Sequence, residues 1–239
     1  MARPFGSLIP SISNRLSTWN EIQDHVTKAA APRVRPTITL SREFGCEGFV
    51  LADALKARLE ALSGEPWNVY DKTLLETVAK EEGIDVATLT RLGETARSFE
   101  KLGITPPEYH QHADAFRVLA ERLVQFATVG NAIVIGRGGA VLCQSLPNCF
   151  HVRIEAPLAW RVKSMAARLE MTEGEASQFV ASHASAREQF MREQLRVDPH
   201  DRSFFNVTFN NARSDVPAMT AAITGYLQAS WKDQSYFKA

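Results

Sequence analysis

The sequence predicts an α/β fold in which a mainly parallel sheet is covered by helices on both faces. Two observations carry this prediction. Short runs of β-branched and aromatic residues alternate along the chain with longer segments of helical periodicity. With 239 residues, of which 45% are hydrophobic, the chain is also long enough to bury a substantial core.

Five short apolar runs are the predicted strands, and polar or glycine-rich sequence follows each of them. They span residues 37–40, 65–71, 131–135, 150–155 and 204–211. Helical periodicity fills the intervals, at residues 50–62, 72–82, 85–96, 113–129, 158–170, 173–195 and 216–231. Asp71 precedes the second of these helices, and a role as its N-cap would by itself account for this residue.

Residues 1–36 are predicted to be a helical extension, and residues 37–239 the main domain. Leu16, Trp19, Ile22 and Val26 recur at helical spacing in the extension, and the AAAPRVRP segment ends the pattern. Two interpretations stay open: a helix packed on the domain surface, or a helix that binds a partner.

Composition argues against several classes of protein. Lys and Arg number 27, as do Asp and Glu, so no basic excess points to nucleic acid. No apolar run approaches the ~20 residues of a membrane span, and the N-terminus lacks a signal-peptide core. Cys46, Cys143 and Cys149 form no CxxC pair, which is typical of reduced thiols. We therefore expect a cytoplasmic protein that binds neither membrane nor nucleic acid.

The segment SREFGCEG, after the first predicted strand, has the layout of a phosphate-binding loop. Its glycines, Gly45 and Gly48, precede a helix whose N–H groups and dipole favour an anion, and Arg42 adds a charged donor. The strict pattern GxxxxGK[ST] is absent, and Glu47 opposes a phosphate unless it points outward. An ordinary strand-to-helix turn is the alternative.

A second glycine turn, Gly136-Arg137-Gly138-Gly139, follows the third predicted strand. It places an arginine where a phosphate can approach the backbone, although a surface arginine paired to a carboxylate is the alternative. Arg161 and Arg168 lie seven residues apart on one helix, hence on one face, and Arg187 and Arg192 lie on the next. The loop, this turn and Asp71 all follow strands, so we expect them to meet at one edge of the sheet. No metal site is predicted, since His110 and His112 lack partners at ligand spacing.

Several segments together resemble the cytidylate-kinase-like family of bacterial P-loop proteins. They are SREFGCEGFVLADAL, VYDKTLLETVAKEEG, NAIVIGRGGAVL, NCFHVRIEAPLAWRV and FFNVTFNN, which occur in the family's order. The resemblance implies a three-layer P-loop NTPase fold with a five-stranded parallel core and the first strand at its centre. It also implies a helical acceptor-binding region at residues 72–130 and a lid-like region at about 158–200.

Site residues follow from the resemblance by position. Residues 41–49 would bind donor phosphates, which adds Ser41 and Cys46 to the loop residues above. Asp71 and Arg137, with Gly136 and Gly138, would lie on the acceptor side, and Arg161, Arg168, Arg187 and Arg192 would be lid candidates. The chain departs from the family where Glu47 replaces a glycine and Phe49 an arginine, and it lacks the lysine of true cytidylate kinases.

The leading hypothesis is a phosphotransferase that moves the γ-phosphoryl group of ATP, with Mg²⁺ bound to the nucleotide, to a nucleoside monophosphate such as CMP. The alternative is a catalytically inactive nucleotide- or phosphate-binding regulatory module. Its partners would be small-molecule nucleotides in either case. The sequence does not indicate an oligomeric state.

Deletion of residues 1–32 should leave the main domain folded, because Pro32 and Pro36 separate the extension from the first strand. The shortened chain should unfold in a single cooperative transition when it is heated or titrated with urea. Loss of that transition would show instead that the apolar stripe of the extension belongs to the core.

Overall fold

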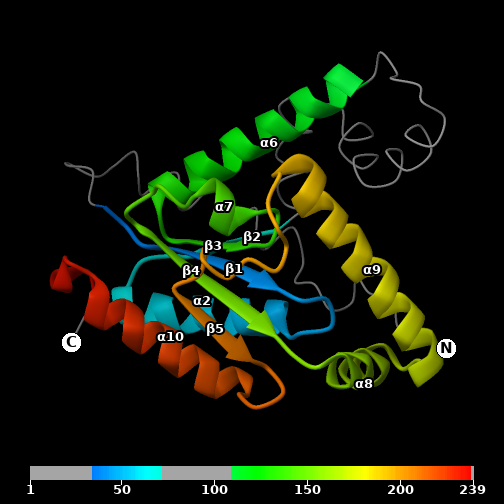
Figure 1. Ribbon diagram of the computed structural model, residues 1–239. Coiled ribbons are helices and arrows are strands. Elements are labelled where there is room, and N and C mark those ends of the chain that lie inside the picture. The colour runs from blue at the N-terminus through cyan, green and yellow to red at the C-terminus, as the bar shows by residue number, and fades with distance from the viewer. Residues whose placement is uncertain (1–33, 72–108, 238–239) are drawn as a thin grey trace.

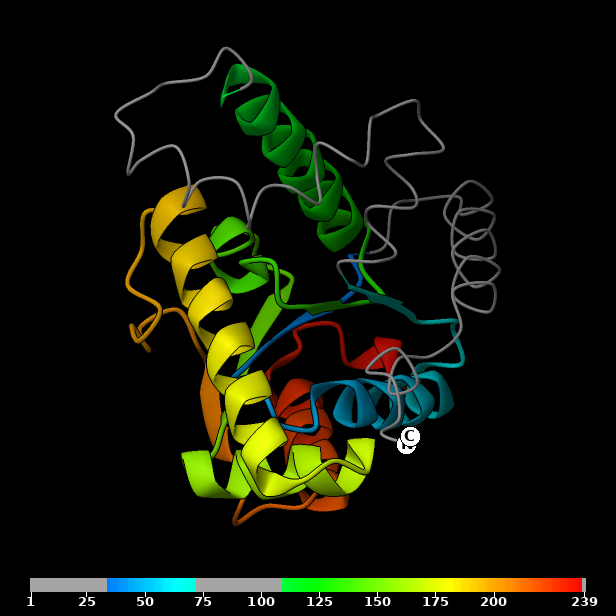
Figure 2. The same cartoon turned by 90° about the vertical axis from the view of Figure 1, so that its right-hand side faces the viewer.

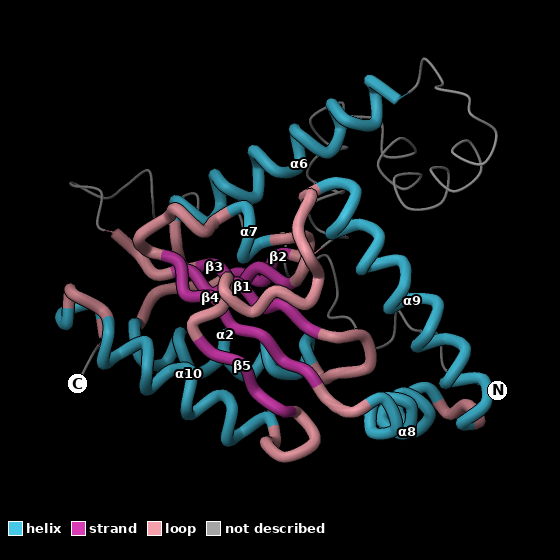
Figure 3. The backbone as a smooth tube through the Cα atoms, viewed as in Figure 1, coloured by secondary structure: helices cyan, strands magenta, loops and turns pink. Residues whose placement is uncertain are grey.

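The computed structural model describes residues 34–71 and 109–237. A five-stranded sheet lies at its centre in the order β2-β3-β1-β4-β5, and every neighbouring pair is parallel (Figures 1 and 3). The strands are β1 (Thr37–Arg42), β2 (Asn68–Tyr70), β3 (Ala132–Ile135), β4 (Cys149–Glu155) and β5 (Val207–Asn210). The predicted fold class is confirmed, including the central position of β1 beside β3.

Helices cover both faces of the sheet and one of its edges. They are α2 (Gly48–Ser63), α6 (Tyr109–Val129), α7 (Gly139–Leu142), α8 (Leu158–Leu169), α9 (Glu173–Gln194) and α10 (Val216–Ser230), with a 3₁₀ turn η2 (Gln234–Tyr236). In Figure 1, α2 and α10 lie below the sheet, α6 and α7 above it, and α8 and α9 beside the carboxyl ends of the strands. Within the described ranges, no helix is long and apolar enough to cross a bilayer.

The alternation of side chains along β1 divides the core between the two faces. Ile38 and Leu40 are fully buried in a cluster with residues of α2 and α10. Thr37 and Thr39 occupy the alternate positions, and the Thr37 hydroxyl donates to the carbonyl of Ala127 at the end of α6. The opposite face carries a second cluster formed by α6, β3 and Cys143, whose side chain fills apolar space there.

A third cluster attaches the two edge helices to the turn after β1. The Phe44 side chain, 3% exposed, packs among apolar residues of α8 and α9. Its ring lies edge-on to Phe179 at 5.4 Å between centroids and stacks on His183 at 4.5 Å. Because Phe44 belongs to the predicted phosphate-binding loop, the packing of α8 and α9 fixes that loop directly.

Some boundaries differ from the predictions. β1 continues through Ser41 and Arg42, because these residues pair with Arg153 and Ile154 of β4. α6 begins at Tyr109 rather than at residue 113, and α7 was not predicted because four residues are too few for a periodic signal. The predicted helices at 72–82 and 85–96, the first of which Asp71 would cap, and residues 1–33 of the predicted extension at 1–36 lie outside the described residues.

A buried histidine joins the two central strands. Nδ1 of His151 on β4 and the Thr39 hydroxyl on β1 share a hydrogen bond of 2.7 Å. Burial lowers the pKa of His151 below its ordinary value, since the charged ring would lose its hydration. The folded protein therefore holds this ring neutral at a pH where the unfolded chain takes up a proton.

This difference predicts how stability depends on pH. Below about pH 6.5 the unfolded state binds more protons at this residue, so the free energy of unfolding should fall as the pH falls, by ~1.4 kcal/mol for each unit between the two pKa values. His151→Gln keeps a polar partner for Thr39 and removes the titration. Urea unfolding between pH 7 and 5 should give a shallower decline for this variant. Equal slopes would contradict the assignment.

Candidate functional site

The carboxyl ends of β1, β2 and β3 bring the predicted phosphate groups together. The loop after β1, Asp71 after β2 and the glycine-arginine turn after β3 meet at this edge, and α9 runs past it (Figures 1 and 2). Asp71 is almost completely buried, at 2% exposure. The predicted convergence of these three segments is confirmed by the sheet order.

The Arg42 side chain extends from the end of β1 between two glycines. A Cβ atom added to Gly48 would lie 3.1 Å from Cδ of Arg42, and one added to Gly136 would overlap its Nη1. A side chain at either glycine would therefore displace Arg42 from its present position. Its guanidinium consequently lies against the helix start on one side and the turn after β3 on the other.

Arg137 has a backbone conformation that is uncommon for a residue with a side chain. Its φ is 49°, between Gly136 at 70° and Gly138 at 69°, so three successive residues are left-handed. Glycine adopts this region freely, whereas for a non-glycine residue such unfavourable backbone conformations cost about 1–3 kcal/mol of free energy. A Cβ added to Gly138 would also collide with the Leu195 side chain after α9, which would have to move. The strained turn points to a role for the arginine that it presents.

Arg187 brings a third guanidinium to this edge, from α9. Its Nη1 donates to the carbonyl of Arg42 at 3.4 Å. Burial, together with the nearby charge of Arg137, lowers the pKa of Arg187 to about 10. Burial and the charges of Arg187 and Arg137 also hold the pKa of Arg42 well below its usual value, while Asp71 acts in the opposite direction.

The electrostatic balance of these four groups favours an anion. Arg42, Arg137 and Arg187 carry three positive charges and Asp71 one negative charge, which leaves two in excess. An arginine does not lose its proton in a protein, so a depressed pKa expresses an unfavourable energy of the cation. A ligand with two or more negative charges would remove that penalty.

Each of these arginines lies over the ring of a phenylalanine. The distances from the guanidinium carbon to the ring centroid are 5.6 Å for Arg42 on Phe49, 5.1 Å for Arg137 on Phe190 and 4.9 Å for Arg187 on Phe44. An aromatic face attracts a cation without occupying its N–H groups. The three phenylalanines therefore stabilise the charges while leaving their donors for other partners.

Arg161 and Arg168 of α8 are also near the loop, but they contact its outer side. Nη1 of Arg161 donates to the Phe44 carbonyl at 3.1 Å, and Nη2 of Arg168 to the Gly45 carbonyl at 2.8 Å. Because C=O and N–H point in opposite directions across a trans peptide, the Gly45 N–H faces away from α8. These arginines are placed to orient the loop, and they occupy one helix face as predicted.

The first turn of α2 presents backbone donors at the same place. The N–H groups of Gly48, Phe49 and Val50 have no acceptor in the described part of the chain, as expected at a helix start. Leu51 is the first residue of the helix whose N–H is bonded, to the carbonyl of Glu47. The helix dipole adds to these donors and favours an anion.

Glu47 points outward, toward Asn211 in the turn between β5 and α10. Its N–H donates to Oδ1 of Asn211 at 2.8 Å, and Nδ2 of Asn211 donates to its carboxylate at 3.0 Å. Its charge also raises the pKa of Arg168, which burial lowers. The condition on which the loop could accept a phosphate, an outward Glu47, is therefore met.

Three other predicted residues contribute less. Ser41 is a half-buried strand residue, and burial raises the pKa of Cys46 to about 12, so this thiol fills space in the loop. The Arg192 side chain is 55% exposed and pairs with Glu188 one helical turn away, which describes a solvated helix face.

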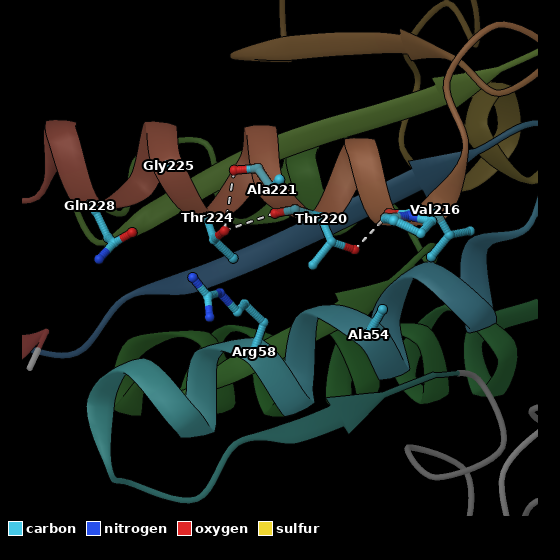
Figure 4. Close-up of a pocket in the computed structure, with 9 residues that line it drawn as sticks. Ala54, Arg58, Val216, Thr220, Ala221, Thr224, Gly225 and Gln228 are labelled. Atoms are coloured by element: carbon cyan, nitrogen blue, oxygen red, sulfur yellow. Dashed lines mark hydrogen bonds between the residues drawn. The ribbon is translucent and has the colours of Figure 1, made fainter.

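A groove between α2 and α10 does not coincide with this edge. The residues that line it are Ala54, Arg58, Val216, Pro217, Thr220, Ala221, Thr224, Gly225 and Gln228 (Figure 4). None of the predicted site residues is among them, and we assign no role to this groove.

The contacts of the phenylalanines with the arginines, and the contribution of Asn211, were not predicted. Phe44, Phe49 and Phe190 have no spacing relation to the arginines that they contact. Asn211 follows β5, so its place at the carboxyl end of a strand was the one available signal.

Comparison with known proteins now decides the family. Residues 37–213 match the cytidylate kinase-like family. The chain belongs to this family. Membership supports a kinase-type phosphotransferase at a general level. The predicted resemblance is thereby confirmed.

Three solved structures align with this family member, and the first of them shows the shared fold. An uncharacterized protein from Eubacterium ventriosum ATCC 27560 aligns with a TM-score of 0.61 at 17% identity, over 82% of this chain and 99% of that chain. TT1252 from Thermus thermophilus aligns at 0.42 and 16% identity, over 82% and 99%. A shikimate kinase from Bacteroides thetaiotaomicron aligns at 0.45 and 12% identity, over 81% and 98%. The search of curated proteins returns no match.

Replacing Arg137 should weaken anion binding. Arg137→Ala should reduce the affinity for inorganic phosphate or CMP, measured by calorimetry, by ~1.5–3 kcal/mol, the range for hydrogen bonds to charged groups. Arg192→Ala removes an equal charge from the exposed face of α9 and should leave the affinity unchanged. Equal effects of the two variants would contradict a specific role for Arg137.

Proposed function

We propose that this protein transfers the γ-phosphoryl group of MgATP to a nucleoside monophosphate, with CMP as the first candidate. The observation that carries the proposal is the convergence of Arg42, Arg137 and Arg187 on the strand edge that also holds the phosphate-binding loop. Phosphoryl transfer depends mainly on positioning and on neutralising charge, and guanidinium groups on several sides of one site supply both.

On the donor side, the β- and γ-phosphates would be held by the free N–H groups at the start of α2. Arg42 would supply the charge that the missing lysine provides in true cytidylate kinases. Phe49 occupies the position after Gly48 and lies under the Arg42 guanidinium, which supports this exchange of roles. Mg²⁺ usually binds through substrate phosphates, water and one or two carboxylates, and Asp71 can supply one carboxylate.

On the acceptor side, Arg137 would bind the phosphate of the monophosphate through its planar donors. An oxygen of that phosphate would attack the γ-phosphorus, and the bond from this phosphorus to the β–γ bridging oxygen would break. Arg42 and Arg187 would stabilise the charge on the transferred group. Asp71 would orient the acceptor or a magnesium-bound water.

A second function, phosphate or nucleotide binding without turnover, follows from one observation. The loop lacks the lysine of true cytidylate kinases, and loss of one stabilising charge from a reacting site can cost several kcal/mol of transition-state stabilisation. A regulatory module would keep the anion-binding site but would have no phosphoryl-transfer activity.

A coupled assay of ADP release, run with ATP against a panel of nucleoside monophosphates, separates the two functions. We expect turnover with CMP or a related monophosphate, and Arg187→Ala should reduce kcat by ~10–100-fold because its charge acts on the transferred group. Arg192→Ala serves again as the matched control.

Calorimetry with ATP completes the test. Binding without turnover for any monophosphate would select the binding module. Neither binding nor turnover would refute both functions and leave the family fold alone.

A further inference from the structure

Glu47 and Asn211 form a reciprocal clamp across 164 positions of sequence. The Glu47 N–H donates to Oδ1 of Asn211 at 2.8 Å, and Nδ2 of Asn211 donates back to Oε2 of Glu47 at 3.0 Å. Asn211 is 4% exposed, and its own N–H donates to the carbonyl of Glu155 at the end of β4. One end of the clamp is therefore fixed to the sheet and the other to the loop.

The clamp has two consequences for a ligand of the loop. It holds the Glu47 carboxylate on Asn211, and the positive charge of Arg168 is near enough to attract that carboxylate. It also occupies the Glu47 N–H, so this amide is not offered to a ligand. A glycine, which the family has at position 47, has no carboxylate to complete such a pair.

We propose that Asn211 is a positioning residue of the donor-phosphate loop, which makes an acidic loop compatible with a phosphate ligand. This inference rests on the proposed function, because the ligand is the triphosphate of ATP. Through the clamp, Asn211 directs that triphosphate to the N–H groups of Gly48, Phe49 and Val50. Without Asn211, the Glu47 carboxylate is free to turn toward the phosphates and repel them.

A purely structural role in the turn between β5 and α10 makes a different prediction. Nδ2 of Asn211 also lies 3.4 Å from the carbonyl of Ser214 in that turn. If this were its whole role, the charge at position 47 would not matter when Asn211 is lost. The two roles therefore differ in how substitutions at 47 and 211 combine.

The test is a double-mutant cycle on the full chain, with ATP affinity measured by calorimetry. Glu47→Gln keeps an acceptor for Asn211 and should change the affinity less than about 2-fold. Asn211→Ala should weaken binding by about 5–20-fold. The double variant should recover several-fold of that loss, and more at low salt, because the repelling charge is gone. Asn206→Ala is the matched control, since its Oδ1 accepts from the His151 N–H at the amino end of β5.

Amide hydrogen exchange at Glu47 measures the clamp independently of ATP. Protection of this amide in the native chain should be lost in Asn211→Ala. Lost protection with unchanged ATP affinity, or no recovery in the double variant, would overturn the positioning role. If the native chain does not bind ATP, the proposed function fails and the positioning role with it, while exchange at Glu47 still reports whether the clamp forms.

Discussion

Three cations, Arg42, Arg137 and Arg187, gather at this site, and the burial of Arg42 and Arg187, together with repulsion among the three charges, is the constraint on which its arrangement depends. Each is held by a different element: a central strand, a left-handed turn and a helix that crosses the strand ends. None of them can lose its proton, so their mutual repulsion destabilises the folded chain. The favourable packing of the rest of the fold must offset this cost. An anion would relieve that repulsion in proportion to its charge, so we expect the site to prefer phosphates of high charge to singly charged ions.

A second group of arginines keeps the loop in shape. Arg161 and Arg168 bond its carbonyls, and Phe44 packs between α8 and α9, so the loop and these helices stabilise one another. The arginines of α8 and α9 near the loop therefore differ in their surroundings. Those of α8 bond the outer carbonyls of the loop, whereas Arg187 of α9 bonds the Arg42 carbonyl and lies near the charges of Arg42 and Arg137. Substitutions in α8 should consequently be interpreted through loop geometry before any direct contact with a ligand is invoked.

The fold was largely predictable from the sequence, because the periodicity of hydrophobic residues and the glycines that follow strands are local signals. All five strands occur where the apolar runs predicted them, and the strand ends brought Arg137 and Asp71 to the same edge. The site was predictable only in part. Spacing placed Arg161 and Arg168 on one face but could not tell which surface that face meets. The clamp of Glu47 with Asn211 depends on tertiary packing between two loops, which no local pattern encodes.

The position of Arg42 bears on whether this arrangement suits transfer or only binding. Its side chain lies against Gly48 at the start of α2 and against Gly136 at the turn that carries Arg137. A protein that holds a single phosphate needs cations around one position. Here one guanidinium lies between the two positions at which donor and acceptor phosphates would bind, which is where a phosphoryl group would pass from one to the other. The Arg42 guanidinium would interact most strongly when negative charge is spread between the donor and acceptor phosphates, as it is in the transition state of phosphoryl transfer. The geometry thus favours a kinase over a passive phosphate-binding module.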